Sequence, residues 1–95
     1  MTPLVLGEDE VAARLRGTEW ERDGEAIVRD LRLDNFAAAI EFVDRVARVA
    51  EENNHHPDIL IEWNTVTLNL WTHTAGGVTA ADEALAERID ELDAQ

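Results

Sequence analysis

The sequence predicts an α+β fold in which three helices pack on one face of a four-stranded antiparallel sheet. Three features of the chain predict this class: two strand-turn-strand patterns, a long amphipathic segment between them, and a shorter helical pattern near each end. Two hairpins joined through a helix favour one antiparallel sheet with its helices on a single side. The expected element order is α-β-β-α-β-β-α, and at 95 residues the chain is expected to form one domain over 1–95.

The first helix and the first hairpin are predicted from acidic, glycine and turn residues. Acidic residues follow Gly7, where they suit the first turn of a helix, and Gly17 suits its end. Asp23-Gly24 is a strong signal for a two-residue hairpin loop, which would place Trp20 opposite Ile27. A short helix followed by a hairpin is therefore expected.

The central helix carries more apolar surface than one sheet can cover. It is expected to begin at a cap formed by Asp34 or Asn35 and to run to about Glu52. Its first apolar stripe contains Phe36, Ile40, Val43, Ala47 and Ala50, and its second contains Phe42, Val46 and Val49. The second stripe suggests a partner helix, which another copy of the chain would supply, or alternatively the first helix covers it.

The second hairpin is expected to bring two histidines together. With a turn at Asn64-Thr65, apolar residues pair across its strands: Trp63 with Val66, Ile61 with Leu68 and Ile59 with Leu70. The same register places His56 opposite His73, on the face that also carries Trp71. Two imidazoles and an indole would then share one corner of the sheet.

The last helix is predicted from the residues at its start. Ala75-Gly76-Gly77 suits a turn, and Thr79-x-x-Asp82 is the pattern of a capping box, in which two side chains satisfy backbone N–H groups at the start of a helix. A helix is therefore expected from this box to near the end of the chain.

The composition argues against several classes of function. Aspartate and glutamate number 21 against eight basic residues, and the formal net charge is −13, so nucleic acid and anionic membrane surfaces are not expected partners. The chain has no cysteine, which excludes a disulfide framework, a thiol nucleophile and a thiolate metal site. No signal peptide is expected, and the longest apolar run, Phe36–Ile40, is far too short to span a bilayer. We expect a cytoplasmic protein.

Three kinds of chemistry are open to the three histidines. His55 and His56 precede Pro57, which disfavours helical backbone before it, so the pair is expected where the central helix passes into a strand. A zinc site is disfavoured, because adjacent side chains in extended backbone point to opposite faces. A purely structural role is the second possibility. Acid/base catalysis is the third, because imidazole both gives and takes a proton near neutral pH. With neither cysteine nor lysine present, dehydration or tautomerisation fits better than hydrolysis.

The spacing of these residues resembles a family signature. Glu51-x₃-His55-His56-Pro57, followed by Trp63, His73 and Asp82, is similar to the motif of the pterin-4a-carbinolamine dehydratases. The resemblance implies the same α+β fold, assembly into homodimers or homotetramers through continuous sheets and the long helix, and no metal or organic cofactor. It also implies loss of water from 4a-hydroxytetrahydrobiopterin to give quinonoid dihydropterin, which recycles the cofactor of aromatic amino acid hydroxylases.

The resemblance and the hairpin register together predict a site. Its expected members are His55, His56 and His73 as catalytic residues, and Glu51, Trp71 and Asp82 as substrate-binding residues. Which imidazole is the acid and which the base stays open. A frayed helix end would also explain Glu51, which could instead orient His55, and the capping box alone would explain Asp82. Trp63 is expected to pack in the core. The alternative function is a non-catalytic protein-binding or assembly module of the same fold.

Overall fold

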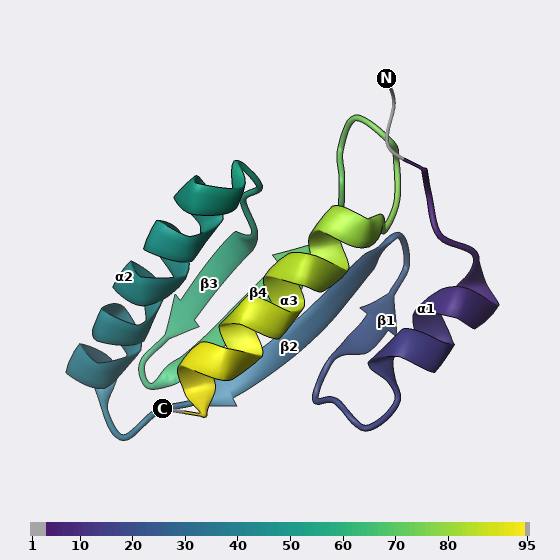
Figure 1. Ribbon diagram of the computed structural model, residues 1–95. Helices are drawn as coiled ribbons and strands as arrows, with labels where there is room; N and C mark the ends of the chain where they lie inside the picture. Colours follow the sequence, from purple (N-terminus) through teal and green to yellow (C-terminus); the bar gives the residue numbers. More distant parts are fainter. Residues whose placement is uncertain (1–3, 95) are drawn as a thin grey trace.

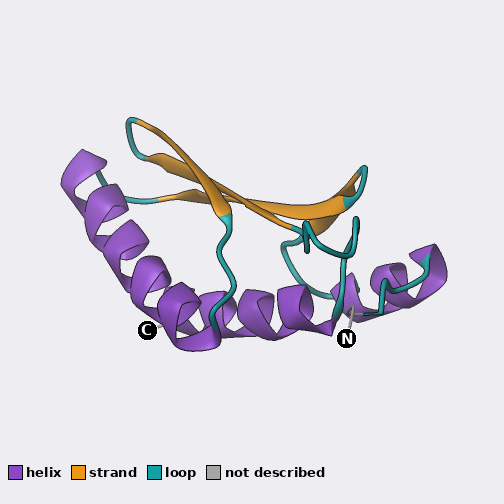
Figure 2. Cartoon of the chain, turned by 90° about the horizontal axis from the view of Figure 1, so that it is seen from above, coloured by secondary structure: helices purple, strands orange, loops and turns teal. Residues whose placement is uncertain are grey.

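The computed structural model describes residues 4–94 and has the element order that the sequence predicts. The elements are α1 (Glu8–Leu15), β1 (Glu21–Asp23), β2 (Ala26–Arg32), α2 (Phe36–Asn53), β3 (Asp58–Glu62), β4 (Thr65–Leu70) and α3 (Ala80–Asp93). The four strands form one antiparallel sheet in the order β1-β2-β4-β3 (Figure 1). Figure 2 shows the three helices on one side of this sheet, so the predicted class is confirmed and the other face of the sheet is open.

The hydrophobic core lies between the sheet, α2 and α3. Inward-facing residues alternate along the central strands, as the two-residue period of a strand requires. The largest fully buried apolar side chains come from β2, β4 and α3: Ile27, Val66, Leu68, Leu70, Leu85 and Ile89. Val11 of α1 and Trp20 extend this core toward β1. The core therefore packs against β2 and β4, and β4 leads directly to Trp71 and His73.

The second apolar stripe of α2 is buried within its own subunit. Phe42, Val46 and Val49 pack in the core, where α2 contacts both the sheet and α3. The expectation that a partner copy covers this stripe is wrong. The alternative that α1 covers it is also wrong, because α1 lies beside β1, away from α2 (Figure 1). The apolar residues that α2 leaves exposed belong instead to its first stripe, Phe36 at 53% and Ile40 at 39%. No helix within residues 4–94 has the length and apolar character needed to cross a membrane.

The first hairpin turns one residue later than predicted. Its loop is Gly24-Glu25, so Arg22, not Trp20, lies opposite Ile27. Gly24 has a φ of +62° at the first loop position, where two-residue hairpin loops commonly need a positive φ. The correct loop is therefore the one that gives the glycine this position.

The second hairpin turns one residue earlier than predicted, at Trp63-Asn64. Ile61 lies opposite Val66, and the other pairs shift with it. The reason is that Thr65 already pairs with Arg32 of β2, so β4 begins there. Because the register differs by two residues, every strand residue keeps its predicted face. Trp63 is the exception: it lies in the loop and is 71% exposed, so its expected place in the core is wrong.

A partly buried ion-pair cluster joins α3 to β2. Arg29 lies on the inward face of β2, where its guanidinium donates from Nη1 to Asp90 Oδ1 at 2.5 Å and from Nη2 to Asp93 Oδ2 at 2.7 Å. Trp20 Nε1–H donates to the same Asp90 oxygen at 2.8 Å. The cluster holds the carboxyl-terminal half of α3 against the sheet, while the start of α3 lies near the histidines.

Candidate active site

The backbone at the end of α2 places His55 and His56 side by side at one end of the sheet. Asn54 caps the helix in the left-handed conformation, with a φ of 49°. The Asn54 N–H donates to Glu51 O and the His55 N–H to Ala50 O, which are the backbone bonds of a helix that turns sharply out of its axis. Two residues later β3 begins, so the histidines lie at the predicted junction between helix and strand.

One cleft of about 550 Å³ brings the three histidines together with Trp71. It is lined by Asn54, His55, His56, Pro57, Asp58, Trp71, Thr72, His73 and Thr74. These residues come from the α2–β3 junction and from the segment that follows β4. The cleft therefore joins two chain segments that are distant in sequence.

His73 lies against Trp71 and not against His56. The ring centroids of Trp71 and His73 are 4.1 Å apart, with an angle of 42° between the rings. The predicted opposition of His56 and His73 is wrong, because the observed register, continued past the strand ends, places Trp71 across from His56. His73 reaches the cleft from the loop after β4, whereas His55 and His56 reach it from the α2–β3 junction. Within that loop, Thr72 and Gly77 form a backbone bridge on either side of His73.

His55 is paired with a completely buried carboxylate. Its Nε2 lies 2.5 Å from Asp82 Oδ1. Asp82 Oδ2 accepts from the Thr79 backbone N–H and from the Thr72 hydroxyl, both at 2.8 Å. The capping box predicted for Thr79 and Asp82 is confirmed, and the same carboxylate also contacts a histidine of the cleft. A single aspartate thus connects the start of α3 to the α2–β3 junction.

His56 has a carboxylate partner of its own. Its Nε2 lies 2.5 Å from Glu51 Oε2, and both side chains are exposed. Glu51 therefore lies beside His56 and not beside His55. An acidic residue near the carboxyl-terminal end of a helix opposes the helix dipole, so the position of Glu51 in α2 is unfavourable. The contact with His56 gives Glu51 a favourable interaction at this position. Each of the adjacent imidazoles has one ring nitrogen next to one acid.

Comparison with known proteins agrees with this geometry. The family model described as pterin 4 alpha carbinolamine dehydratase matches residues 5–92. The chain belongs to this dehydratase family. It is 48% identical over 93 residues to a provisionally named pterin-4-alpha-carbinolamine dehydratase of Nocardia farcinica, covering 97% of this chain and 98% of that one. It is 51% identical over 88 residues to a relative of the same name from Chloroflexus aurantiacus, covering 92% and 95%. The name denotes a hydro-lyase.

Solved structures support the same assignment. The crystal structure of a transcriptional coactivator/pterin dehydratase from Brucella melitensis superposes with a TM-score of 0.89 at 32% identity, covering 94% of this chain and 98% of that one. A pterin dehydratase-like protein described as a RuBisCO assembly factor of the α-carboxysome superposes with a TM-score of 0.63 at 24% identity, covering 77% and 84%. The second structure shares the fold.

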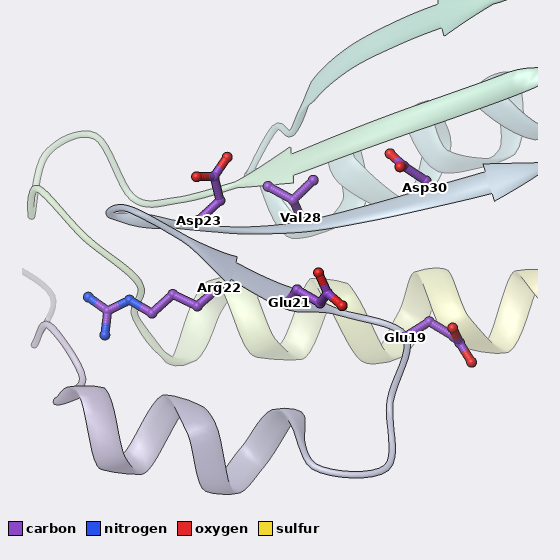
Figure 3. A pocket seen from close by; sticks show the side chains of 6 residues that line it. All are labelled: Glu19, Glu21, Arg22, Asp23, Val28 and Asp30. Carbon is purple, nitrogen blue, oxygen red and sulfur yellow. The ribbon is translucent and has the colours of Figure 1, made fainter.

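Four other clefts formed by residues 4–94 of this dehydratase family member contain no histidine. A cleft of about 470 Å³ lies on the open side of the first hairpin (Figure 3). It is lined by Glu19, Glu21, Arg22, Asp23, Val28 and Asp30. It holds neither a histidine nor an aromatic side chain, so it offers no imidazole for proton transfer and no ring face for a planar substrate. Within residues 4–94, no group of three histidine or acidic side chains is arranged to hold a metal ion.

Sequence reasoning missed Thr72 as a member of the site. Thr72 is buried, and its hydroxyl bonds both Asp82 and Thr79. No local pattern identifies such a hydroxyl, because its partners are seven and ten residues away on another element. Its position directly before His73 is the only hint in the sequence.

Proposed function

We propose that this chain removes water from 4a-hydroxytetrahydrobiopterin to give quinonoid dihydropterin. The reaction would recycle the pterin cofactor of aromatic amino acid hydroxylases. The observation that carries the proposal is the convergence of His55, His56 and His73 with Trp71 around one cleft. Membership of the dehydratase family supports the same reaction.

The reaction needs an acid at the hydroxyl group on C4a and a base at the neighbouring N5. The acid protonates the hydroxyl group on C4a, the C4a–O bond breaks, and water leaves. The base removes the proton from N5, and the electrons of the N–H bond form the C4a=N5 double bond. Imidazole can serve in both roles near neutral pH, and a cleft with three of them supplies both groups without any cofactor.

The other predicted residues support this assignment in different ways. Trp71 offers an aromatic face next to His73 on which a planar pterin would stack. Glu51 lies next to His56 at the surface but does not line the cleft, so we propose that it acts on the substrate through His56. Asp82 is completely buried, so we propose that it acts on the substrate through His55.

We also propose that the chain forms a homodimer or homotetramer. β3 is an edge strand of the sheet, so one side of its backbone is free to pair with another copy. Leu60 of β3 and Trp63 of the adjoining loop are exposed, as are Phe36 and Ile40 on α2. Two such surfaces would allow one contact that continues the sheet and a second that packs α2 against α2.

A direct assay tests the activity. The rate of quinonoid dihydropterin formation from chemically generated 4a-hydroxytetrahydrobiopterin should rise in proportion to protein concentration and should survive dialysis against a chelator. Loss on dialysis and recovery with zinc would instead establish a metal site. A folded protein without activity would favour the alternative function, a protein-binding or assembly module of the same fold.

Single alanine variants at the three histidines test the mechanism. His55→Ala, His56→Ala and His73→Ala should each lower kcat, by roughly 10²–10⁴-fold where the ring transfers a proton. The losses should not be additive where one ring replaces another. Full activity in all three variants would remove the histidines from the mechanism. Circular dichroism of each variant provides the control for folding.

A further inference from the structure

The buried hydroxyl groups behind Asp82 have a single consistent donor order. The Ala81 N–H donates to Thr79 Oγ1 at 3.3 Å. The Thr72 hydroxyl donates to Asp82 Oδ2 at 2.8 Å, and Thr72 and Thr79 share a hydrogen bond of 2.8 Å. Each hydroxyl has only one proton, so once Thr72 donates to Asp82, the Thr79 hydroxyl must donate to Thr72. All donors of the cluster therefore point toward Asp82.

This donor order fixes the role of His55. Asp82 Oδ2 accepts from the Thr72 hydroxyl and from the Thr79 N–H, and both bonds favour the ionised carboxylate, which is the better acceptor. With the carboxylate ionised, the contact between Asp82 Oδ1 and His55 Nε2 places the shared proton on Nε2. In the neutral ring, Nδ1 is left with the lone pair. His55, whose ring lines the cleft, would then exchange protons with a substrate only through Nδ1.

Thr72 holds the opposite side of the cleft as well. Its carbonyl oxygen accepts from the N–H groups of Ala75, Gly76 and Gly77, and its N–H donates to Gly77 O. These bonds close the loop that carries His73, the residue directly after Thr72. The side chain of Thr72 thus reaches Asp82 and His55, while its backbone holds the loop of His73.

We propose that Thr72 is a positioning residue for the dehydratase reaction. Through its hydroxyl it orients the Asp82 carboxylate, and so keeps His55 in the form protonated on Nε2. Through its backbone it fixes the loop of His73 relative to that ring. The catalytic part of this inference rests on the proposed function, whereas the form of His55 does not.

The matched variants are Thr72→Val, Thr72→Ser and Thr67→Val. Valine has nearly the shape of threonine but no hydroxyl, and serine keeps the hydroxyl. Thr67 lies on strand β4, which ends two residues before Thr72, and its hydroxyl donates to Asp30 Oδ1 on the open face of the sheet, so Thr67→Val makes the same chemical change away from the cleft. Unfolding curves establish that each variant is folded.

The first measurement is the nitrogen-15 NMR spectrum of the histidine side chains, with His55 assigned by His55→Gln. The unsubstituted protein, Thr72→Ser and Thr67→Val should each show His55 protonated on Nε2 when neutral. Thr72→Val should show a mixture of the two neutral forms. A proton on Nδ1 in the unsubstituted protein overturns the proposal, whether or not the protein has dehydratase activity. If Thr72→Val does not fold, Thr72→Ala takes its place.

The second measurement separates kcat from KM in the dehydratase assay. Thr72→Val should lower kcat by roughly 10-fold, less than the loss of a proton-transferring ring, with KM within about 2-fold of its original value. Thr72→Ser and Thr67→Val should keep kcat within about 2-fold. An unchanged kcat in Thr72→Val, or an equal loss in Thr72→Ser, overturns the catalytic part. An inactive unsubstituted protein refutes the proposed function, and the NMR result still decides how His55 is held.

Discussion

Trp63 has a backbone conformation that bulky residues rarely adopt. Its φ is 52°, in the left-handed region, and its side chain is largely exposed at the tip of the β3–β4 hairpin. Steric crowding of Cβ makes this region cost an ordinary L-residue roughly 1–2 kcal/mol. Within the isolated subunit, the exposed indole gains little burial to offset that cost. The stability of a single subunit therefore does not explain why a tryptophan occupies this position.

Trp63→Asn should therefore stabilise the subunit. Asparagine tolerates the left-handed region, so we expect the free energy of unfolding to rise by up to about 1 kcal/mol. Urea denaturation at low protein concentration measures it, and Glu62→Gln, one residue before on β3, serves as a surface control. A lower free energy in Trp63→Asn would show that the indole makes a stabilising contact, which an assembly through β3 would provide.

At this scale the sequence predicts which residues matter better than what they contact. The motif and the Pro57 signal place the histidines at the end of α2, and the capping box predicts the backbone contact of Asp82. The pairing of Glu51 with His56, and of Asp82 with His55, depends on the left-handed turn at Asn54. Asn is a common residue at such a cap, but spacing along the chain does not show which way the turn directs His55 and His56, so the carboxylate partners could not be predicted from it.

At the scale of elements, the apolar pattern of α2 is predicted correctly, but the surface that packs against its second stripe is not. Both predicted stripes exist, but the sheet and α3 together cover the stripe that contains Val46. The hairpins give a similar result. Their loops differ from prediction by one residue and their registers by two. The conformation of Gly24 selects the first loop, and the pairing of β4 with β2 selects the second. Hydrophobic alternation defines only which face of the sheet a residue occupies.

A pair of truncations on α2 separates its two stripes. Val46 is completely buried, so Val46→Ala should lower the free energy of unfolding by about 1–3 kcal/mol through lost burial and a cavity. Ile40→Ala removes more atoms from a partly exposed position and should cost less than about 1 kcal/mol in the isolated subunit. Chemical denaturation of both variants gives the comparison. The reverse order would mean that Ile40, not Val46, contributes to the core of the folded protein.

At the scale of the whole molecule, the exposed large apolar groups lie at Leu4 and Val5 among the first described residues, on α2, and on β3 and its following loop. The sheet ends at β3 on this side, and α2 lies next to β3 (Figure 1). The other end of the sheet is β1, all three of whose residues are charged, which opposes pairing with another copy. The surfaces suited to self-association are therefore concentrated on the side of the molecule formed by α2 and β3.

Size measurements test this asymmetry. Light scattering at micromolar concentration should give a dimer or a tetramer for the unsubstituted protein. Phe36→Glu should reduce the mass while leaving the circular dichroism spectrum unchanged, because the residue is exposed in the subunit. Ala12→Glu adds the same charge to an exposed position of α1 and should keep the original mass. A monomer of the unsubstituted protein would contradict the oligomer proposal.

The first described residues of the chain lie against the loop that closes the histidine cleft. The Leu6 N–H donates to Val78 O at 2.8 Å, and a Cβ added at Gly77 would lie 2.9 Å from Val5 Cγ1. Gly77 is also the residue that bridges to Thr72 beneath His73. A protein shortened to begin at Gly7 would lose this support. Purification tags and fluorescent fusions therefore belong after α3, because the last turn of this helix lies at the opposite end from Asp82 and its partner His55.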